Sequence, residues 1–101
     1  MAQDPDRTAL RIVVHGRVQG VWYRGWMVDE ARARDLSGWV RNRRDGTVEA
    51  LLVGPEASVR DLIEACRSGP PAARVRGIEE HPASGADLAG FAAGFEQRPT
   101  E

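Results

Sequence analysis

The sequence predicts an α+β fold in which one antiparallel sheet carries two helices on one of its faces. Two observations lead to this prediction. Stretches of alternating apolar and polar residues are interrupted twice by helical apolar stripes, in the order β-α-β-β-α-β. In addition, the pair Asp45-Gly46 lies between two extended runs, and an Asp-Gly pair there is a strong hairpin signal because the turn needs positive φ.

The first two elements differ in the period of their apolar residues. Residues 8–16 alternate, which predicts a strand whose apolar face is formed by Leu10, Ile12 and Val14. Residues 22–35 repeat every three to four positions, which predicts a helix. The residues that would form its buried stripe are Tyr23, Met27 and Ala31, with Trp26 beside them.

The hairpin is predicted over residues 37–54. In its first arm Val40 and Asn42 share a face, which we assign to the helix-covered side of the sheet. In its second arm the corresponding face is formed by Val48, Ala50 and Leu52. An amide at position 42 on that side needs hydrogen-bonding partners or must line a cavity. The alternative is an edge asparagine that only supports the turn.

The remaining elements complete the predicted order. Residues 55–67 form a helix whose apolar stripe is Val59, Leu62, Ile63 and Cys66. Gly69-Pro70 ends it, and residues 73–80 alternate as a strand. Residues 90–97 are a weak last strand with two aromatic anchors, Phe91 and Phe95. Together these elements predict a ferredoxin-like β-α-β-β-α-β sandwich, with two helices on one face of one antiparallel sheet.

The composition narrows the classes of function. The chain has 101 residues, which predicts one domain over residues 8–97 with flexible termini at 1–7 and 98–101. Its formal net charge of −1 argues against a strongly basic nucleic-acid-binding surface. All basic residues other than histidine are arginine, so no lysine Schiff base can form. Cys66 is the only cysteine, which excludes an intrachain disulfide and a cysteine-based zinc site.

Several features indicate a cytoplasmic protein without reactive cysteine or histidine. No apolar run approaches membrane-spanning length, and the polar, acidic stretch MAQDPDRTA is unlike a signal peptide. Cys66 lies on an apolar stripe, so we expect core packing there rather than a nucleophile. His15 and His81 are expected at the surface, because no second histidine is spaced to share a metal with either.

The stretch HGRVQGVWYRGW, residues 15–26, is more elaborate than a connector between strand and helix needs to be. Gly16 and Gly20 permit backbone conformations in which successive N–H groups converge on an anion. The stretch runs into a helix N-terminus, where free N–H groups and the dipole favour negative charge. Arg24 in the first turn opposes that dipole unless an anion lies between them. An ordinary loop with a solvated arginine is the alternative on pattern alone.

Two motifs make the chain resemble the acylphosphatase family. The first is Gly16-Arg17-Val18-Gln19-Gly20-Val21-Trp22-Tyr23-Arg24, and the second is Gly38-Trp39-Val40-Arg41-Asn42. Three further signals follow at the expected spacing: Asp45-Gly46-x-Val48-Glu49, Gly54 and Cys66-x-x-Gly69-Pro70. The resemblance covers about residues 8–97, and the two motifs are highly specific in combination.

The resemblance implies a ferredoxin-like fold and hydrolysis of the carboxyl-phosphate bond in small acyl phosphates, without metal or cofactor. It implies that Arg24 holds the phosphate together with loop amides, and that Asn42 positions the attacking water. The phosphate-binding loop that it implies comprises Gly16, Arg17, Val18, Gln19, Gly20, Val21, Trp22 and Tyr23. The expected partner is a small-molecule substrate rather than nucleic acid or membrane, and a monomer is the simplest state for this size.

The chain departs from the family pattern at two places. Asp35 stands where the family usually has glycine, and a left-handed backbone there would cost some stability. The stretch GFAAGFEQ is less β-like than usual, although neither departure touches Arg24 or Asn42. The alternative to an enzyme is a non-catalytic anion- or RNA-binding module of the same fold. An RNA-binding module predicts exposed aromatic residues on the central strands, and residues 10–14 and 47–53 contain none.

Overall fold

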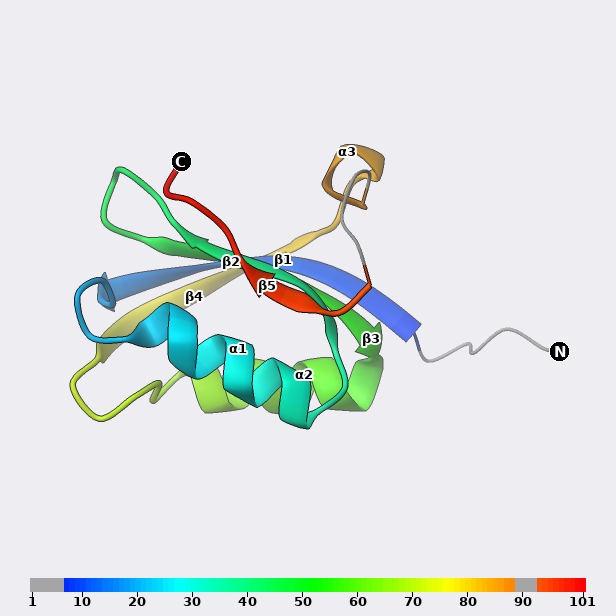
Figure 1. The fold of residues 1–101 in the computed structure, drawn as a ribbon, viewed down its shortest axis with the longest axis horizontal. Helices are drawn as coiled ribbons and strands as arrows, with labels where there is room; N and C mark the ends of the chain where they lie inside the picture. The colour runs from blue at the N-terminus through cyan, green and yellow to red at the C-terminus, as the bar shows by residue number, and fades with distance from the viewer. Residues whose placement is uncertain (1–6, 89–92) are drawn as a thin grey trace, which may run out of the picture.

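The structure, a computed structural model, describes residues 7–88 and 93–101 (Figure 1). It confirms the predicted fold: a five-stranded sheet in the order β4-β1-β3-β2-β5, with α1 and α2 covering one face. The strands are β1 (Arg7–Arg17), β2 (Ser37–Asn42), β3 (Val48–Pro55), β4 (Arg74–Pro82) and β5 (Phe95–Gln97). The helices are α1 (Tyr23–Ala33), α2 (Glu56–Cys66) and the short α3 (Gly85–Leu88).

The core lies between the sheet and the two long helices. Its residues come from the alternate strand positions and the helical stripes that the sequence predicts. The fully buried members on the strands include Ile12, Val14, Val40, Val48, Ala50 and Leu52. Those on the helices include Met27, Ala31, Val59, Leu62 and Cys66. Burying each large apolar side chain contributes roughly 1.5–3 kcal/mol, so the sandwich is held mainly by this layer.

The strand register brings the ends of β1 and β2 together at one end of the sheet. Val14 of β1 lies opposite Val48 of β3, and Val48 in turn lies opposite Asn42 of β2. The chain leaves β1 just beyond this row and enters α1. The loop between β1 and α1 and the last residue of β2 are therefore neighbours, although they are about twenty residues apart in the sequence.

The sheet is antiparallel except at β5, and here the prediction needs correction. Phe95 pairs with Gly38 in parallel register, so β5 runs in the same direction as β2. The reason is the course of the chain. β4 ends at the end of the sheet where β2 begins, so a strand that continues along the β2 edge runs beside β2 in the same direction. Of the predicted last strand, residues 89–92, including Phe91, lie outside the described residues.

Two segments differ from their predicted assignments. β1 extends one residue past its predicted end, to Arg17, and Gly16 and Arg17 pair with Val75 and Arg74 of β4. Residues 85–88, which lie between the two last predicted strands, form the single turn α3. A Ser-Asp pair starts this turn: the Asp87 amide donates to the Ser84 hydroxyl, and the Asp87 carboxylate accepts from the Ser84 amide.

The last residues continue along β2. The Arg98 amide donates to the Val40 carbonyl at 2.8 Å, and the Glu101 amide donates to the Asn42 carbonyl at 3.0 Å. The sequence predicts these residues as a flexible terminus. Within residues 7–88 and 93–101, no helix has the length and apolar character needed to cross a membrane.

Candidate active site

The backbone amide groups at the start of α1 have no hydrogen-bond partners within the helix. Trp22 precedes the helix in the left-handed conformation, with φ 67° and ψ 25°, and no side chain caps the first turn. The first helical hydrogen bond runs from the Trp26 amide to the Trp22 carbonyl at 3.0 Å, so the amides before Trp26 have no partner within the helix. The first turn contains no acidic residue. These free N–H groups and the helix dipole favour an anion at this point.

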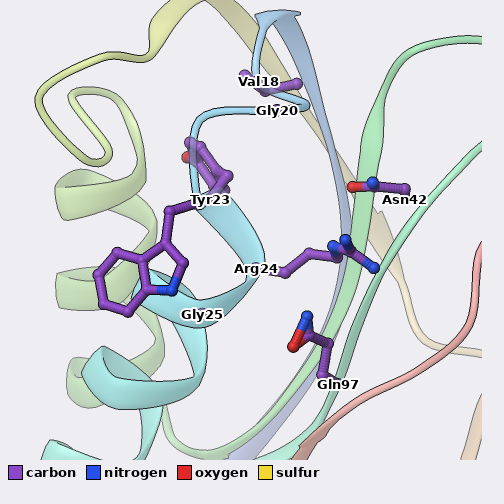
Figure 2. A pocket seen from close by; sticks show the side chains of 8 residues that line it. Val18, Gly20, Tyr23, Arg24, Gly25, Asn42 and Gln97 are labelled. Atoms are coloured by element: carbon purple, nitrogen blue, oxygen red, sulfur yellow. The ribbon is translucent and has the colours of Figure 1, made fainter.

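A small cavity of about 100 Å³ opens at this helix start. Figure 2 shows that its side chains come from the β1–α1 loop, from α1, from β2 and from β5. The lining residues are Val18, Gly20, Trp22, Tyr23, Arg24, Gly25, Asn42 and Gln97. Arg24 reaches from α1 toward Asn42 and Gln97. The structure thus brings both residues implied by the family motifs, Arg24 and Asn42, into one pocket.

Arg24 carries the positive charge of the pocket. Among the described residues, no carboxylate lies within ion-pair distance of its guanidinium, and no hydrogen bond of its side chain occurs. The side chain is half-buried, so its charge is only partly screened by water. A half-buried guanidinium without a carboxylate, beside free helix amides, has donors that match the oxygens of an anion such as phosphate or a carboxylate.

Asn42 faces the pocket from the end of β2. Its backbone is fixed on both sides, by the Val48 pair on β3 and by the Glu101 amide, which donates to its carbonyl. Its half-buried side-chain amide has no hydrogen-bond partner among the residues that the structure describes. An amide held this way can donate to one small molecule and accept from another, so it can orient a water.

Gln19 fastens the loop rather than lining the pocket. Its side-chain nitrogen donates to the Arg43 carbonyl at 2.7 Å and to the Thr47 carbonyl at 2.9 Å. The hairpin that it holds is itself closed by Asp45, whose carboxylate accepts from the Thr47 amide and hydroxyl. These hydrogen bonds hold the pKa of Asp45 below its usual value. The loop is therefore tied to the β2–β3 turn, next to the strand end that carries Asn42.

The predicted loop residues separate into those that line the pocket and those that do not. Gly16 and Arg17 lie in β1, and a Cβ atom at Gly16, where φ is 129°, would collide with the Arg74 carbonyl oxygen of β4. Gly16 thus serves close strand packing rather than the pocket. Val21 packs against the core, whereas the pocket-lining members are Val18, Gly20, Trp22 and Tyr23. Gly20 needs its glycine because its φ is 75°.

Two buried titratable groups, the Tyr23 hydroxyl and the Cys66 thiol, have raised pKa values. The Tyr23 hydroxyl donates to the Cys66 carbonyl at 2.5 Å, and burial raises the pKa of Tyr23 far above its usual value. Burial also raises the pKa of the Cys66 thiol to about 12, which agrees with its place in the core. Across the described part of the chain, no three His, Cys, Asp or Glu side chains are grouped to hold a metal ion.

Gln97 is a pocket residue that the sequence did not predict. It lies on β5 beside Val40 of β2, and it lines the same pocket as Arg24 and Asn42. Figure 2 shows its side chain directed toward Arg24. The sequence offered no signal for this position, because only the parallel pairing of β5 with β2 brings residue 97 to the pocket.

Comparison with known proteins shows the family of the chain. The acylphosphatase family profile matches residues 10–96. The chain belongs to the acylphosphatase family. A curated acylphosphatase of Rhodospirillum rubrum is 55% identical over 82 residues, which cover 81% of this chain and 90% of the relative. A second, from Rhizorhabdus wittichii, is 50% identical over 99 residues, covering 98% of this chain and 96% of the relative.

Solved structures agree with this membership. The crystal structure of acylphosphatase from Bacillus subtilis superposes with a TM-score of 0.80 at 40% identity. The match covers 89% of this chain and 97% of the Bacillus chain. The sequence-based identification of the acylphosphatase family is thereby confirmed, and this chain is an enzyme of that family.

Proposed function

We propose that this acylphosphatase hydrolyses the carboxyl-phosphate bond of small acyl phosphates, giving a carboxylate and inorganic phosphate. The observation that carries the proposal is the pairing, in one small pocket, of a guanidinium without a carboxylate partner and an amide without a hydrogen-bond partner. The guanidinium belongs to Arg24 and the amide to Asn42. Family membership makes acyl phosphates the substrate class to test first.

Phosphate binding would use Arg24 and the amides of the loop and first turn. The guanidinium fork matches two phosphoryl oxygens, and the amides before Trp26 can donate to the remaining oxygen. These donors are fixed by the helix and by the hydrogen bonds of Gln19, so little reorganisation is needed as charge develops. In this proposal they stabilise the phosphoryl group in its transition state as well as in the ground state.

Hydrolysis would proceed by attack of water on phosphorus. The Asn42 amide holds a water on one side of the phosphoryl group, and the carboxylate leaves from the opposite side. A bond forms between the water oxygen and phosphorus as the bond between phosphorus and the acyl oxygen breaks. The leaving carboxylate is weakly basic and needs no general acid. The water proton can pass to a phosphoryl oxygen of the substrate, so the mechanism requires no basic side chain.

Hydrolysis of benzoyl phosphate in the presence of EDTA tests the proposal, with wild type, Arg24→Ala and Asn42→Ala compared. We expect wild type to be active and both variants to lose most of the activity while keeping the wild-type circular dichroism spectrum. Inorganic phosphate should inhibit Asn42→Ala about as well as wild type, and Arg24→Ala much less. Full activity in either folded variant would contradict the role given to that residue. An inactive wild type would favour the non-catalytic anion-binding alternative.

Three further expectations accompany this proposal. They are a single domain over residues 8–97, a monomeric state and a cytoplasmic location. Sedimentation velocity of the full chain with and without phosphate would test the monomer, and limited proteolysis would test the domain boundaries. A dimer, or a stable fragment much shorter than residues 8–97, would contradict them.

A further inference from the structure

Trp22 occupies a position at the pocket that is unfavourable in two ways. Its φ of 67° is in the left-handed region, which bulky side chains rarely adopt and which glycine would occupy without strain. Its side chain is also 64% exposed, although it is large and apolar. Among the described residues, the other large apolar side chain exposed to water is Leu88 of α3. Backbone strain of this kind is concentrated at functional sites, which suggests that the Trp22 side chain has a functional role at the pocket.

Gly25 provides the space for the Trp22 ring. A Cβ atom at Gly25 would collide with the Nε1, Cε2 and Cδ1 atoms of the indole, so the ring rests directly on the first turn of α1. A glycine inside a helix is less favourable than alanine. Two locally unfavourable choices, Trp22 and Gly25, therefore combine to hold an aromatic ring beside the pocket that both residues line.

The Trp22 ring lies on the side of the pocket from which the acyl group would leave. This inference rests on the proposed function. Attacking and leaving oxygens lie roughly in line through phosphorus. If Asn42 on β2 holds the water, the acyl oxygen points away from β2, toward the part of the pocket rim that Trp22 and Gly25 line. Figure 2 shows Arg24 reaching from α1, which also carries Gly25, toward β2, with Asn42 on one side of its side chain and Gln97 on the other. The acyl group would thus leave the phosphate beside Trp22.

The pocket is too small to enclose a large acyl group. Its volume of about 100 Å³ is well below the roughly 300–1,000 Å³ of sites that enclose whole ligands. An acyl group larger than acetyl would therefore extend past the rim, where the exposed indole offers an aromatic surface. Acetyl phosphate, in contrast, has too little apolar surface to contact the ring.

We infer that Trp22 is a specificity-determining residue that contacts the acyl group and favours aromatic acyl phosphates over acetyl phosphate. Aromatic pairs add roughly 0.5–1.5 kcal/mol beyond area burial, which corresponds to about a two- to tenfold preference. The Trp22 ring contributes to the ratio of kcat/KM for the two substrates. The phosphate-binding groups act equally on both substrates and cancel in this ratio.

The test is the ratio of kcat/KM for benzoyl phosphate to that for acetyl phosphate. It is measured for wild type, Trp22→Asn, Trp22→Gly and Trp22→Phe. Asn and Gly both tolerate the left-handed backbone and remove the ring, and Phe restores an aromatic surface. Leu88→Ala is the matched control, because it removes an exposed apolar side chain at α3, away from the pocket.

We expect the ratio to fall about two- to tenfold in Trp22→Asn and Trp22→Gly, to recover in large part in Trp22→Phe, and to stay at the wild-type value in Leu88→Ala. An unchanged ratio in Trp22→Asn and Trp22→Gly, with wild type active, would overturn this inference and leave the proposed function intact. A wild type that hydrolyses neither substrate would instead overturn the proposed function and this inference with it.

Discussion

The arginine side chains on the two faces of the sheet differ in their ion pairs. On the open face, Glu49 of β3 is only 3% exposed and is surrounded by three arginines. Its carboxylate pairs with Arg11 at 3.0 Å, with Arg41 at 2.8 Å and with Arg43 at 3.2 Å. On the helix-covered face, Arg24 lies in the pocket without any such carboxylate among the described residues.

The difference shows which arginines are available to a ligand. A buried carboxylate is costly unless its charge is compensated, so the three arginines around Glu49 are committed to the stability of the sheet. Their positive charge is largely cancelled by Glu49 and by the acidic neighbours Asp87, Asp45 and Glu101. Arg24 retains its charge for an external anion. Arginine content alone therefore does not locate the site; Arg24 is distinguished because it lines the pocket together with Asn42.

The largest expected effect is the loss of activity in Arg24→Ala. Removing one donor that stabilises developing charge typically lowers kcat about 10²–10³-fold, and we expect kcat/KM for benzoyl phosphate to fall by this amount. Because Arg24 has no ion pair to lose, the free energy of unfolding in urea should change by less than about 0.5 kcal/mol. A large loss of stability in this variant would show that Arg24 is structural, like the arginines of the open face.

Glu49→Ala should show the opposite pattern. Removing a buried carboxylate leaves three arginines without their shared partner, and breaking such a cluster typically costs about 3–5 kcal/mol. We expect the low end of this range, about 3 kcal/mol by urea unfolding, because the arginines are partly exposed to water. The activity per folded molecule should fall far less than in Arg24→Ala. An equal loss of activity would mean that the two faces are coupled.

Gln97→Glu would place a carboxylate near Arg24, as Glu49 lies near the arginines of the open face. A carboxylate on β5 beside Arg24 should pair with the guanidinium and repel phosphate, weakening phosphate inhibition by about three- to tenfold. Gln97→Met is the matched control, because it keeps the length of the side chain without the charge. Equal inhibition constants for Gln97→Glu and Gln97→Met would indicate that residue 97 does not act on Arg24.

The smallest effect is expected at Asp35, outside both regions. Asp35 has the left-handed backbone that the sequence suggested, with φ 59°. Glycine removes this strain but loses more conformational entropy on folding, so Asp35→Gly should stabilise the protein by only about 0.5 kcal/mol. The melting temperature should rise by a few degrees, with kcat/KM unchanged. Asp35→Ala is the control and should be less stable than wild type, because alanine tolerates this conformation poorly.

The sequence by itself determined the order of elements and the chemical identity of the two central site residues. Helical and strand periods, the Asp45-Gly46 turn and the stop at Gly69-Pro70 are local features, which nearby residues suffice to specify. Arg24 and Asn42 belong to contiguous motifs, so they too could be named before the structure was known. The resemblance to the family likewise drew attention to Asp35, because the family usually has glycine at that position.

Tertiary structure decided how these parts meet. The parallel direction of β5 brings Gln97 to the pocket, and the close approach of β4 assigns Gly16 to strand packing rather than to the loop. Glu49 pairs with three arginines on the open face, whereas Arg24 lines the pocket. Each of these features depends on residues that are distant in the chain, and a local sequence pattern carries no record of such distances. The sequence therefore names the motif residues Arg24 and Asn42, and the packing of distant segments decides which residues join them in the pocket.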